Sequence, residues 1–99
     1  MMSDVLGKFA KRPDERKRYT IEYGEWLDSG ELLTTVTFKV TPATDSPFVI
    51  DGYLIGESGT LVSFFASGGN DGETYDVVVT ANTTGGQIKE SRILFFVRT

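Results

Sequence analysis

Carboxylates and hydroxyls are the side chains of this sequence that could do chemistry, because its 99 residues contain neither histidine nor cysteine. General acid–base catalysis needs two carboxyl groups in one site with pKa values driven apart. A serine or threonine nucleophile needs a base beside it. The acidic residues instead stand mostly in separate turns: Asp28, Glu31, Asp45, Glu57, Asp71 and Glu73. We therefore expect solvated turn carboxylates, no catalytic residues and no enzymatic activity.

Metal and phosphate sites also lack their usual residues. Thiolate and imidazole ligands are absent, and the acidic residues do not follow the ligand spacing of an EF-hand. The glycine-rich segment 67–72 lacks the Gly-Lys-Ser/Thr ending of a phosphate-binding loop. We expect no metal and no cofactor, and we interpret this segment as a turn between strands.

The elements that must position any site are strands, and the clearest are in the segment 67–98. Alternate residues from Tyr75 to Ala81 are apolar, which predicts a strand with one buried face, and a second strand over 87–98 completes a β-hairpin. Asp71 precedes Tyr75 by four residues, the spacing of an immunoglobulin-type tyrosine corner. We predict a structural role for this pair, in which Asp71 bonds the backbone amides of its loop.

Four earlier segments also have strand patterns, over 19–23, 32–41, 48–55 and 60–66. The segment 48–55 is irregular, so we expect it to be bent or broken near Asp51 and Gly52. In 32–41 we expect the even-numbered face in the core: Leu32, Thr34, Val36, Phe38 and Val40. Short strands separated by glycine-containing turns, with no helical pattern, predict an all-β fold: an immunoglobulin-like antiparallel β-sandwich of about seven strands.

The N-terminal segment differs from the rest in charge. The chain has a net charge of −4, but residues 1–18 carry six basic against three acidic side chains. Pro13 opposes a regular helix there. We divide the chain into an extended basic arm over 1–17 and a sandwich over 18–99. The arm is either a solvated tail or a segment that orders against a neighbouring subunit. Nucleic acid binding is not expected, because the acidic body would repel a polyanion.

Eight residues are candidates for a protein interface. The basic residues of the arm form one group. Both faces of the last strand are apolar near its end, so if one face packs in the core, Leu94 and Phe96 on the other face could form a second contact surface. The single tryptophan either caps the core or anchors an interface. The last strand's outer residues are covered either by the chain itself or by another subunit. These candidates are Lys11, Arg12, Arg16, Lys17, Arg18, Trp26, Leu94 and Phe96.

Length and hydropathy restrict the setting. A chain of this size forms one domain with a single core. The sequence contains no apolar run long enough for a signal peptide or a membrane span. We therefore expect a protein made in a cytoplasm, not secreted, with no membrane contact.

Several segments together resemble a known group of proteins. They are KRPDERKRY (11–19), YGEWLDSGE (23–31), FFASGG (64–69), YDV (75–77) and FVR (96–98). The chain resembles the small immunoglobulin-like structural proteins of tailed bacteriophages over about residues 11–98. This resemblance implies a virion component without catalytic activity, either a capsid decoration protein or a part of the neck, tail or fibre. It assigns no task to individual residues.

The sequence therefore predicts a structural virion protein that packs as an oligomer through its N-terminal arm and sheet surface. Its partners would be other virion proteins and copies of itself, after synthesis in the host cytoplasm. The alternative is a recognition module whose loops bind a carbohydrate or a host cell-surface protein, as loops on rigid sandwiches often do. Its binding platform would be Trp26, Phe48 and Tyr53.

Overall fold

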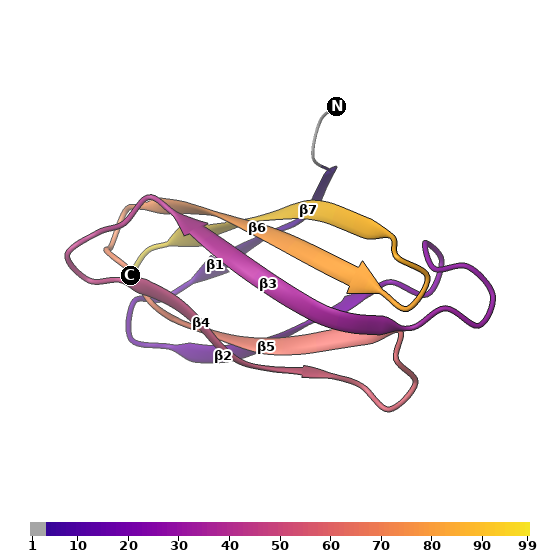
Figure 1. The fold of residues 1–99 in the computed structure, drawn as a ribbon. Helices are drawn as coiled ribbons and strands as arrows, with labels where there is room; N and C mark the ends of the chain where they lie inside the picture. The colour runs from indigo at the N-terminus through magenta and orange to yellow at the C-terminus, as the bar shows by residue number, and fades with distance from the viewer. Residues whose placement is uncertain (1–3) are drawn as a thin grey trace.

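The computed structural model describes the backbone of residues 4–99 and the side chains of residues 7–99. These residues form two β-sheets packed face to face (Figure 1), and they contain no helix. The strands are β1 (Asp4–Lys11), β2 (Arg16–Glu22), β3 (Leu33–Thr41), β4 (Phe48–Ile55), β5 (Leu61–Gly68), β6 (Thr74–Thr83) and β7 (Ile88–Val97). The predicted all-β sandwich of about seven strands is confirmed.

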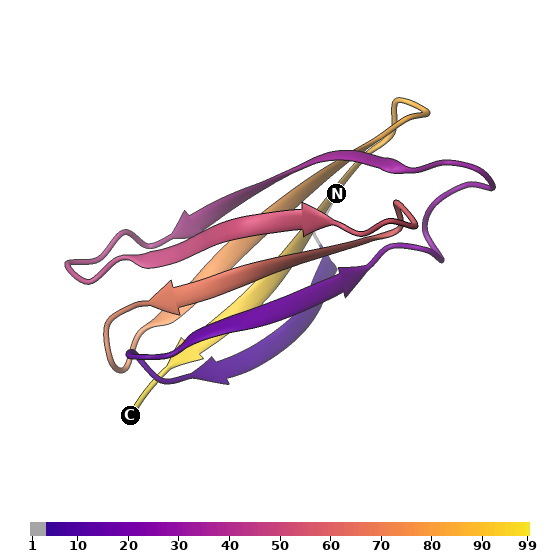
Figure 2. The ribbon, with the colours of Figure 1, turned by 90° about the horizontal axis from the view of Figure 1, so that it is seen from below.

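One sheet has four strands in the order β1-β7-β6-β3, and the other has three in the order β2-β5-β4 (Figure 2). The orders β2-β5-β4 and β7-β6-β3 correspond to strands B-E-D and G-F-C of immunoglobulin domains. We expected an antiparallel sandwich, but one pairing differs: β1 pairs with β7 in parallel. A short turn at 12–15 then carries the chain from β1 into the other sheet.

Alternating side chains from both sheets fill the core, as the strand patterns predict. Tyr75, Val77, Val79 and Ala81 of β6 are all fully buried. Aromatic rings join the two layers, since Phe48 of β4 packs on Tyr75 and Phe95 with centroid distances of 4.8 and 5.0 Å. Aromatic pairs at such distances add to the stabilisation from burial.

The start of β3 differs from the predicted face. Leu32 was expected in the core but is 43% exposed, whereas Leu33 is buried. The pairing of β3 with β6 shifts register between Leu33 and Thr35. A bulge of this kind places two residues opposite one and reverses the side-chain alternation on its N-terminal side. Val36, Phe38 and Val40 beyond it point toward the core, as expected. The predicted irregularity near Asp51 is confirmed, because β4 shifts register between Asp51 and Leu54.

The N-terminal segment also differs from expectation. Instead of an arm outside the sandwich, residues 4–11 form β1 at the edge of the larger sheet, in parallel register with Ser91–Val97. The segment is extended, as predicted, but its partner is the last strand of the same chain. The backbone groups along the outer edge of β7 explain this pairing, because they bond an extended segment whatever its side chains are. Residues 1–3 lie outside the described part.

Candidate protein interfaces

The outer face of the three-stranded sheet contains two arginines beside one phenylalanine ring. The guanidinium carbon of Arg16 lies 3.9 Å from the centroid of Phe65, and that of Arg18 lies 5.1 Å away. The strand register explains this arrangement, because Arg18 of β2 and Asp51 of β4 are the direct neighbours of Phe65 on β5. Arg16 also donates a hydrogen bond to Asp51 at 3.0 Å.

Exposed apolar side chains surround this cluster. Val49 and Leu54 of β4 are 39% and 67% exposed. We call Arg16, Arg18, Asp51, Phe65, Val49 and Leu54 the basic–aromatic face. The Arg16 and Asp51 side chains remain 52% and 49% exposed, so their ion pair stabilises the fold by no more than about 1 kcal/mol. An exposed set of arginine and apolar groups of this kind is suited to contact with another protein.

Leu94 and Phe96 lie on the opposite side of the molecule, on the outer face of the four-stranded sheet. Both are half-buried. In β1, Lys8 is the register partner of Leu94, and Ala10 is that of Phe96. The chain's own N-terminal segment therefore flanks this apolar pair and leaves part of each side chain exposed.

The remaining basic candidates lie around the turn between β1 and β2. Lys11 is only 2% exposed, and its Nζ donates hydrogen bonds to the carbonyl oxygens of Arg12 at 2.6 Å and Glu15 at 2.9 Å. Burial lowers the pKa of Lys11, and the nearby Glu15 and Asp14 carboxylates offset part of this effect. Lys11 therefore stabilises the turn and is not accessible to a partner. Arg12 is exposed.

Lys17 and Trp26 do not join the basic–aromatic face. Lys17 alternates with Arg16 and Arg18 on β2, and its Nζ lies 5.8 Å from the Tyr19 ring. Trp26 follows β2, is half-buried and packs against the core, with its ring 6.1 Å from that of Tyr23. The indole therefore caps one end of the sandwich. The eight candidate residues occupy several separate regions and not one site.

Tyr75 bonds two loops through its hydroxyl, whereas Asp71 bonds Thr99 instead of the amides of its own loop. The Tyr75 hydroxyl accepts a hydrogen bond from the Asn70 amide at 2.8 Å and lies 2.6 Å from Thr44 Oγ1. Thr44 donates its proton to the Ser46 carbonyl, so Tyr75 is the donor to Thr44. Asp71 accepts from the backbone amide of Thr99 at 2.9 Å. Tyr75 thus joins two loops at one end of the sandwich, while Asp71 holds the C-terminal residue.

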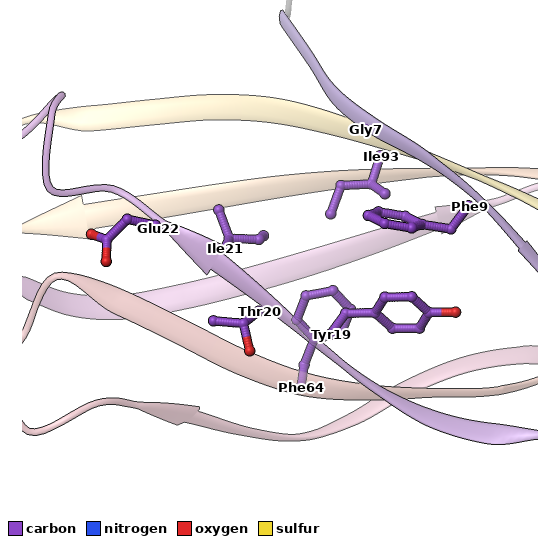
Figure 3. A pocket seen from close by; sticks show the side chains of 8 residues that line it. All are labelled: Gly7, Phe9, Tyr19, Thr20, Ile21, Glu22, Phe64 and Ile93. Atoms are coloured by element: carbon purple, nitrogen blue, oxygen red, sulfur yellow. The ribbon is translucent and has the colours of Figure 1, made fainter.

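A cavity of about 190 Å³ lies between the edge strands β1 and β2 (Figure 3). Its apolar lining comes from both sheets, and Thr20 and Glu22 stand at its exposed side: Gly7, Phe9, Tyr19, Thr20, Ile21, Glu22, Phe64 and Ile93. The Tyr19 hydroxyl is buried without a hydrogen-bond partner among the described residues. Burial and the nearby Glu15 raise its pKa. Within residues 7–99, no three acidic side chains lie close enough together to hold a metal ion.

Sequence reasoning did not identify Phe65, Val49 and Leu54 as surface residues of interest. The alternation of side chains along β5 places Phe65 on the face opposite Phe64. Its neighbours come from β2 and β4, which are distant in sequence, so only the paired sheet reveals the cluster.

In the part of the chain that the structure describes, no helix is long and apolar enough to cross a membrane. No curated protein matches the sequence. A solved structure of a 2,6-sialyltransferase from Vibrionaceae Photobacterium sp. JT-ISH-224 resembles the chain with a TM-score of 0.53 and 14% identity. The match covers 100% of this chain and 18% of the sialyltransferase chain, and at this identity it shows the fold alone.

A family model gives the decisive comparison. The model of the podophage GP4 fiber-tail adaptor protein gp77 matches residues 11–95, which include β2 to β6 and most of β7. The match agrees with the phage resemblance noted in the sequence. The chain therefore belongs to the gp77 family of podophage GP4 fiber-tail adaptor proteins and is a structural component of a phage virion.

Proposed function

We propose that this chain joins a tail fibre to the tail of a podophage virion as a non-enzymatic adaptor. An adaptor must contact two different proteins at once, so it needs two surfaces that do not overlap. The observation that supports this role is the presence of apolar side chains on both outer faces. Phe65 and Leu54 lie on the three-stranded sheet, and Leu94 and Phe96 lie on the four-stranded sheet.

The basic–aromatic face is the stronger candidate for the first partner. Arginine and aromatic residues are enriched among the residues that dominate protein–protein binding, and here they are already held in place by stacking and by Asp51. The acidic remainder of the chain would repel an acidic partner at a distance. The guanidinium groups of Arg16 and Arg18 would instead favour a partner that is not strongly acidic overall but places carboxylates against this face.

Several copies of the chain would act together in this proposal. They would contact one another through the N-terminal segment, and their location would be the virion after synthesis in the host cytoplasm. A role in capsid decoration is not part of the proposal, because the family is one of fibre–tail adaptors. A recognition module is also not favoured, since Trp26 packs against the core.

The test is a phage whose gene for this chain is deleted and then supplied in the host as wild type or as a variant. We expect particles without the chain to lack attached fibres and the wild type to restore them. Arg18→Glu should lower incorporation about tenfold, the effect of about 1.4 kcal/mol in binding. Asp45→Lys, an exposed charge reversal in the loop before β4 and outside both outer faces, should be incorporated normally. Electron microscopy counts the fibres and mass spectrometry measures the chain.

Fibres attached to particles that lack the chain would contradict an adaptor role. Fibre-bearing deletion particles that fail to adsorb, together with binding of the purified wild-type chain to host cells, would favour the recognition module instead.

A further inference from the structure

The strand β1 forms one edge of the four-stranded sheet. It pairs with β7 alone, in the one parallel pairing of the described strands, and its register shifts between Val5 and Gly7. The family match begins at residue 11, so the residues that precede Lys11 lie outside it. The part of the chain that defines the family thus extends from the end of β1 to β7.

Few side chains connect β1 to the core. Of its inward-facing positions that the structure describes, Gly7 has no side chain and Lys11 bonds the following turn. Phe9 contacts the rings of Tyr19 at 4.9 Å and Phe95 at 5.7 Å, yet it is 39% exposed. The cavity of about 190 Å³ lies directly beside Gly7 and Phe9. The contact between β1 and the body is therefore incompletely packed beside Gly7 and Phe9.

The turn at 12–15 would have to open if β1 were to leave its own sandwich. Its backbone hydrogen bond runs from the Glu15 amide to the Arg12 carbonyl at 3.2 Å, and the Lys11 ammonium bonds the same carbonyl. Apart from Pro13, the turn consists of charged residues, which remain solvated when the segment is extended. We call the chain closed when β1 pairs with β7 of the same chain, as it does in this structure. The short turn at 12–15 allows this pairing.

From these observations we infer that copies of this chain exchange β1, so that β1 of one copy pairs with β7 of a neighbouring copy. The inference rests on the proposed function, in which copies contact one another through the N-terminal segment, and it names the surface that they use. An exchanged strand meets the same register partners and the same Tyr19 and Phe95 rings as in the closed chain. Such exchange of an identical element gives a specific contact with few new interactions.

The absence of cysteine allows a direct test. Lys8 and Leu94 are register partners on the outer face, so a cysteine at each can be joined by a short thiol cross-linker. One full-length chain carries Lys8→Cys and a second carries Leu94→Cys. The two chains are mixed at high concentration, unfolded and refolded together, and cross-linked. A covalent heterodimer forms when β1 of one chain pairs with β7 of the other.

The matched control replaces Leu94→Cys by Thr37→Cys, an exposed position on β3 at the opposite edge of the same sheet. We expect about tenfold less covalent dimer in this control, because only random contacts join the two thiols. Equal yields in the two mixtures would overturn the inference. Strand exchange is also ruled out if a chain carrying both Lys8→Cys and Leu94→Cys, refolded at the same concentration, cross-links only within itself.

The length of this turn provides a second measurement. Deletion of Pro13 and Asp14 leaves too few residues for the closed turn, so the shortened chain should elute as a dimer or larger oligomer. Insertion of Gly-Ser between the same two residues should favour the monomer. A shortened chain that folds as a monomer would contradict exchange. None of these results depends on fibre attachment. Strand exchange can therefore be disproved without contradicting the adaptor role, and the adaptor role can be disproved without contradicting strand exchange.

Discussion

At the scale of single residues, Tyr75 has the clearest structural task. Its ring is fully buried and stacks on Phe48, while its hydroxyl connects the loops before β4 and before β6 through Thr44 and Asn70. The sequence spacing predicted a structural role for Tyr75 but named no hydrogen-bond partner for its hydroxyl. Asp71 was expected to bond the backbone amides of its own loop, but it accepts a hydrogen bond from the amide of Thr99. The sequence could not indicate this partner, because the position of Thr99 depends on the pairing of β7.

Tyr75→Phe should therefore keep the fold and weaken it. The Asn70 amide loses its acceptor, and Thr44 Oγ1 loses its donor, so the free energy of unfolding should fall by about 1–2 kcal/mol. Urea unfolding followed by fluorescence measures this change. Tyr53→Phe is the control, because Tyr53 is 43% exposed and should change stability by less than about 0.5 kcal/mol. Equal effects of the two substitutions would show that the Tyr75 hydroxyl is not structural.

Glu31 gives a prediction about pH. The hydroxyl of Thr83 donates to its carboxylate at 2.6 Å, and the Asp28 amide and Gln87 also donate. These hydrogen bonds, that of Thr83 first, lower the pKa of Glu31 below its usual value of 4.5. A carboxyl with a lowered pKa in the folded state contributes stability above its unfolded value and loses it as pH falls through the folded value.

The melting temperature should therefore drop as pH is lowered below 4.5, and Glu31→Gln should show a shallower drop in this range. Glu57→Gln, at an exposed turn, should keep the wild-type slope. Calorimetry across the acid range makes the comparison. Parallel profiles for wild type and Glu31→Gln would exclude Glu31 as the source of the acid sensitivity.

At the scale of elements, the irregular strand β4 supports the basic–aromatic face. Gly52 lies in its bulge with φ +60°, and a Cβ added there would lie 3.2 Å from the Phe65 ring. Glycine is thus needed at position 52 for two reasons: the backbone there is left-handed, and a side chain would press against the Phe65 ring. The sequence indicated a break at this place, but not its relation to an aromatic residue on β5.

Gly52→Ala should lower the free energy of unfolding by about 1–2 kcal/mol from backbone strain alone, and further because Phe65 must move. Gly72→Ala is a matched control, since Gly72 has φ +86° and no atom within 4 Å of an added Cβ. The difference between the two variants, measured by urea unfolding, isolates the contact with Phe65. A Gly52 variant no less stable than the Gly72 variant would argue against that contact.

At the scale of the whole molecule, the two sheets present separate outer surfaces, and β1 is an addition to one edge. Removal of residues 1–10 should leave a sandwich that still unfolds in one cooperative transition, because the core residues of β2 to β7 remain. Stability should fall by about 1–3 kcal/mol as Phe9 and the β7 pairing are lost. The truncated chain should also be monomeric.

Calorimetry and light scattering test this truncation together. Charge reversal of Lys8 alone serves as a control that keeps β1 and should preserve both stability and oligomeric state. Assembly of the truncated chain with its full oligomeric state would contradict the role given to the N-terminal segment. Loss of any cooperative transition would show that β1 is part of the minimal fold.

Local patterns in the sequence determined the class of the fold. Alternation of apolar residues identified the strands β2 to β7 within a few residues. The sequence also lacks histidine and cysteine, the residues that most catalytic and metal-binding sites use. Such patterns are local, because apolar and polar residues alternate in any strand that buries one face, whichever strands it pairs with. The spacing between Asp71 and Tyr75 likewise predicted a structural role for Tyr75.

Only the tertiary structure decided which segments pair and therefore which side chains meet. The parallel pairing of β1 with β7 joins the two ends of the chain, and the Arg16–Phe65–Arg18 cluster joins strands more than forty residues apart. Both depend on backbone hydrogen bonds, which are the same for every residue type and leave no pattern in either segment alone. For this reason the surfaces proposed for assembly became visible only in the folded chain.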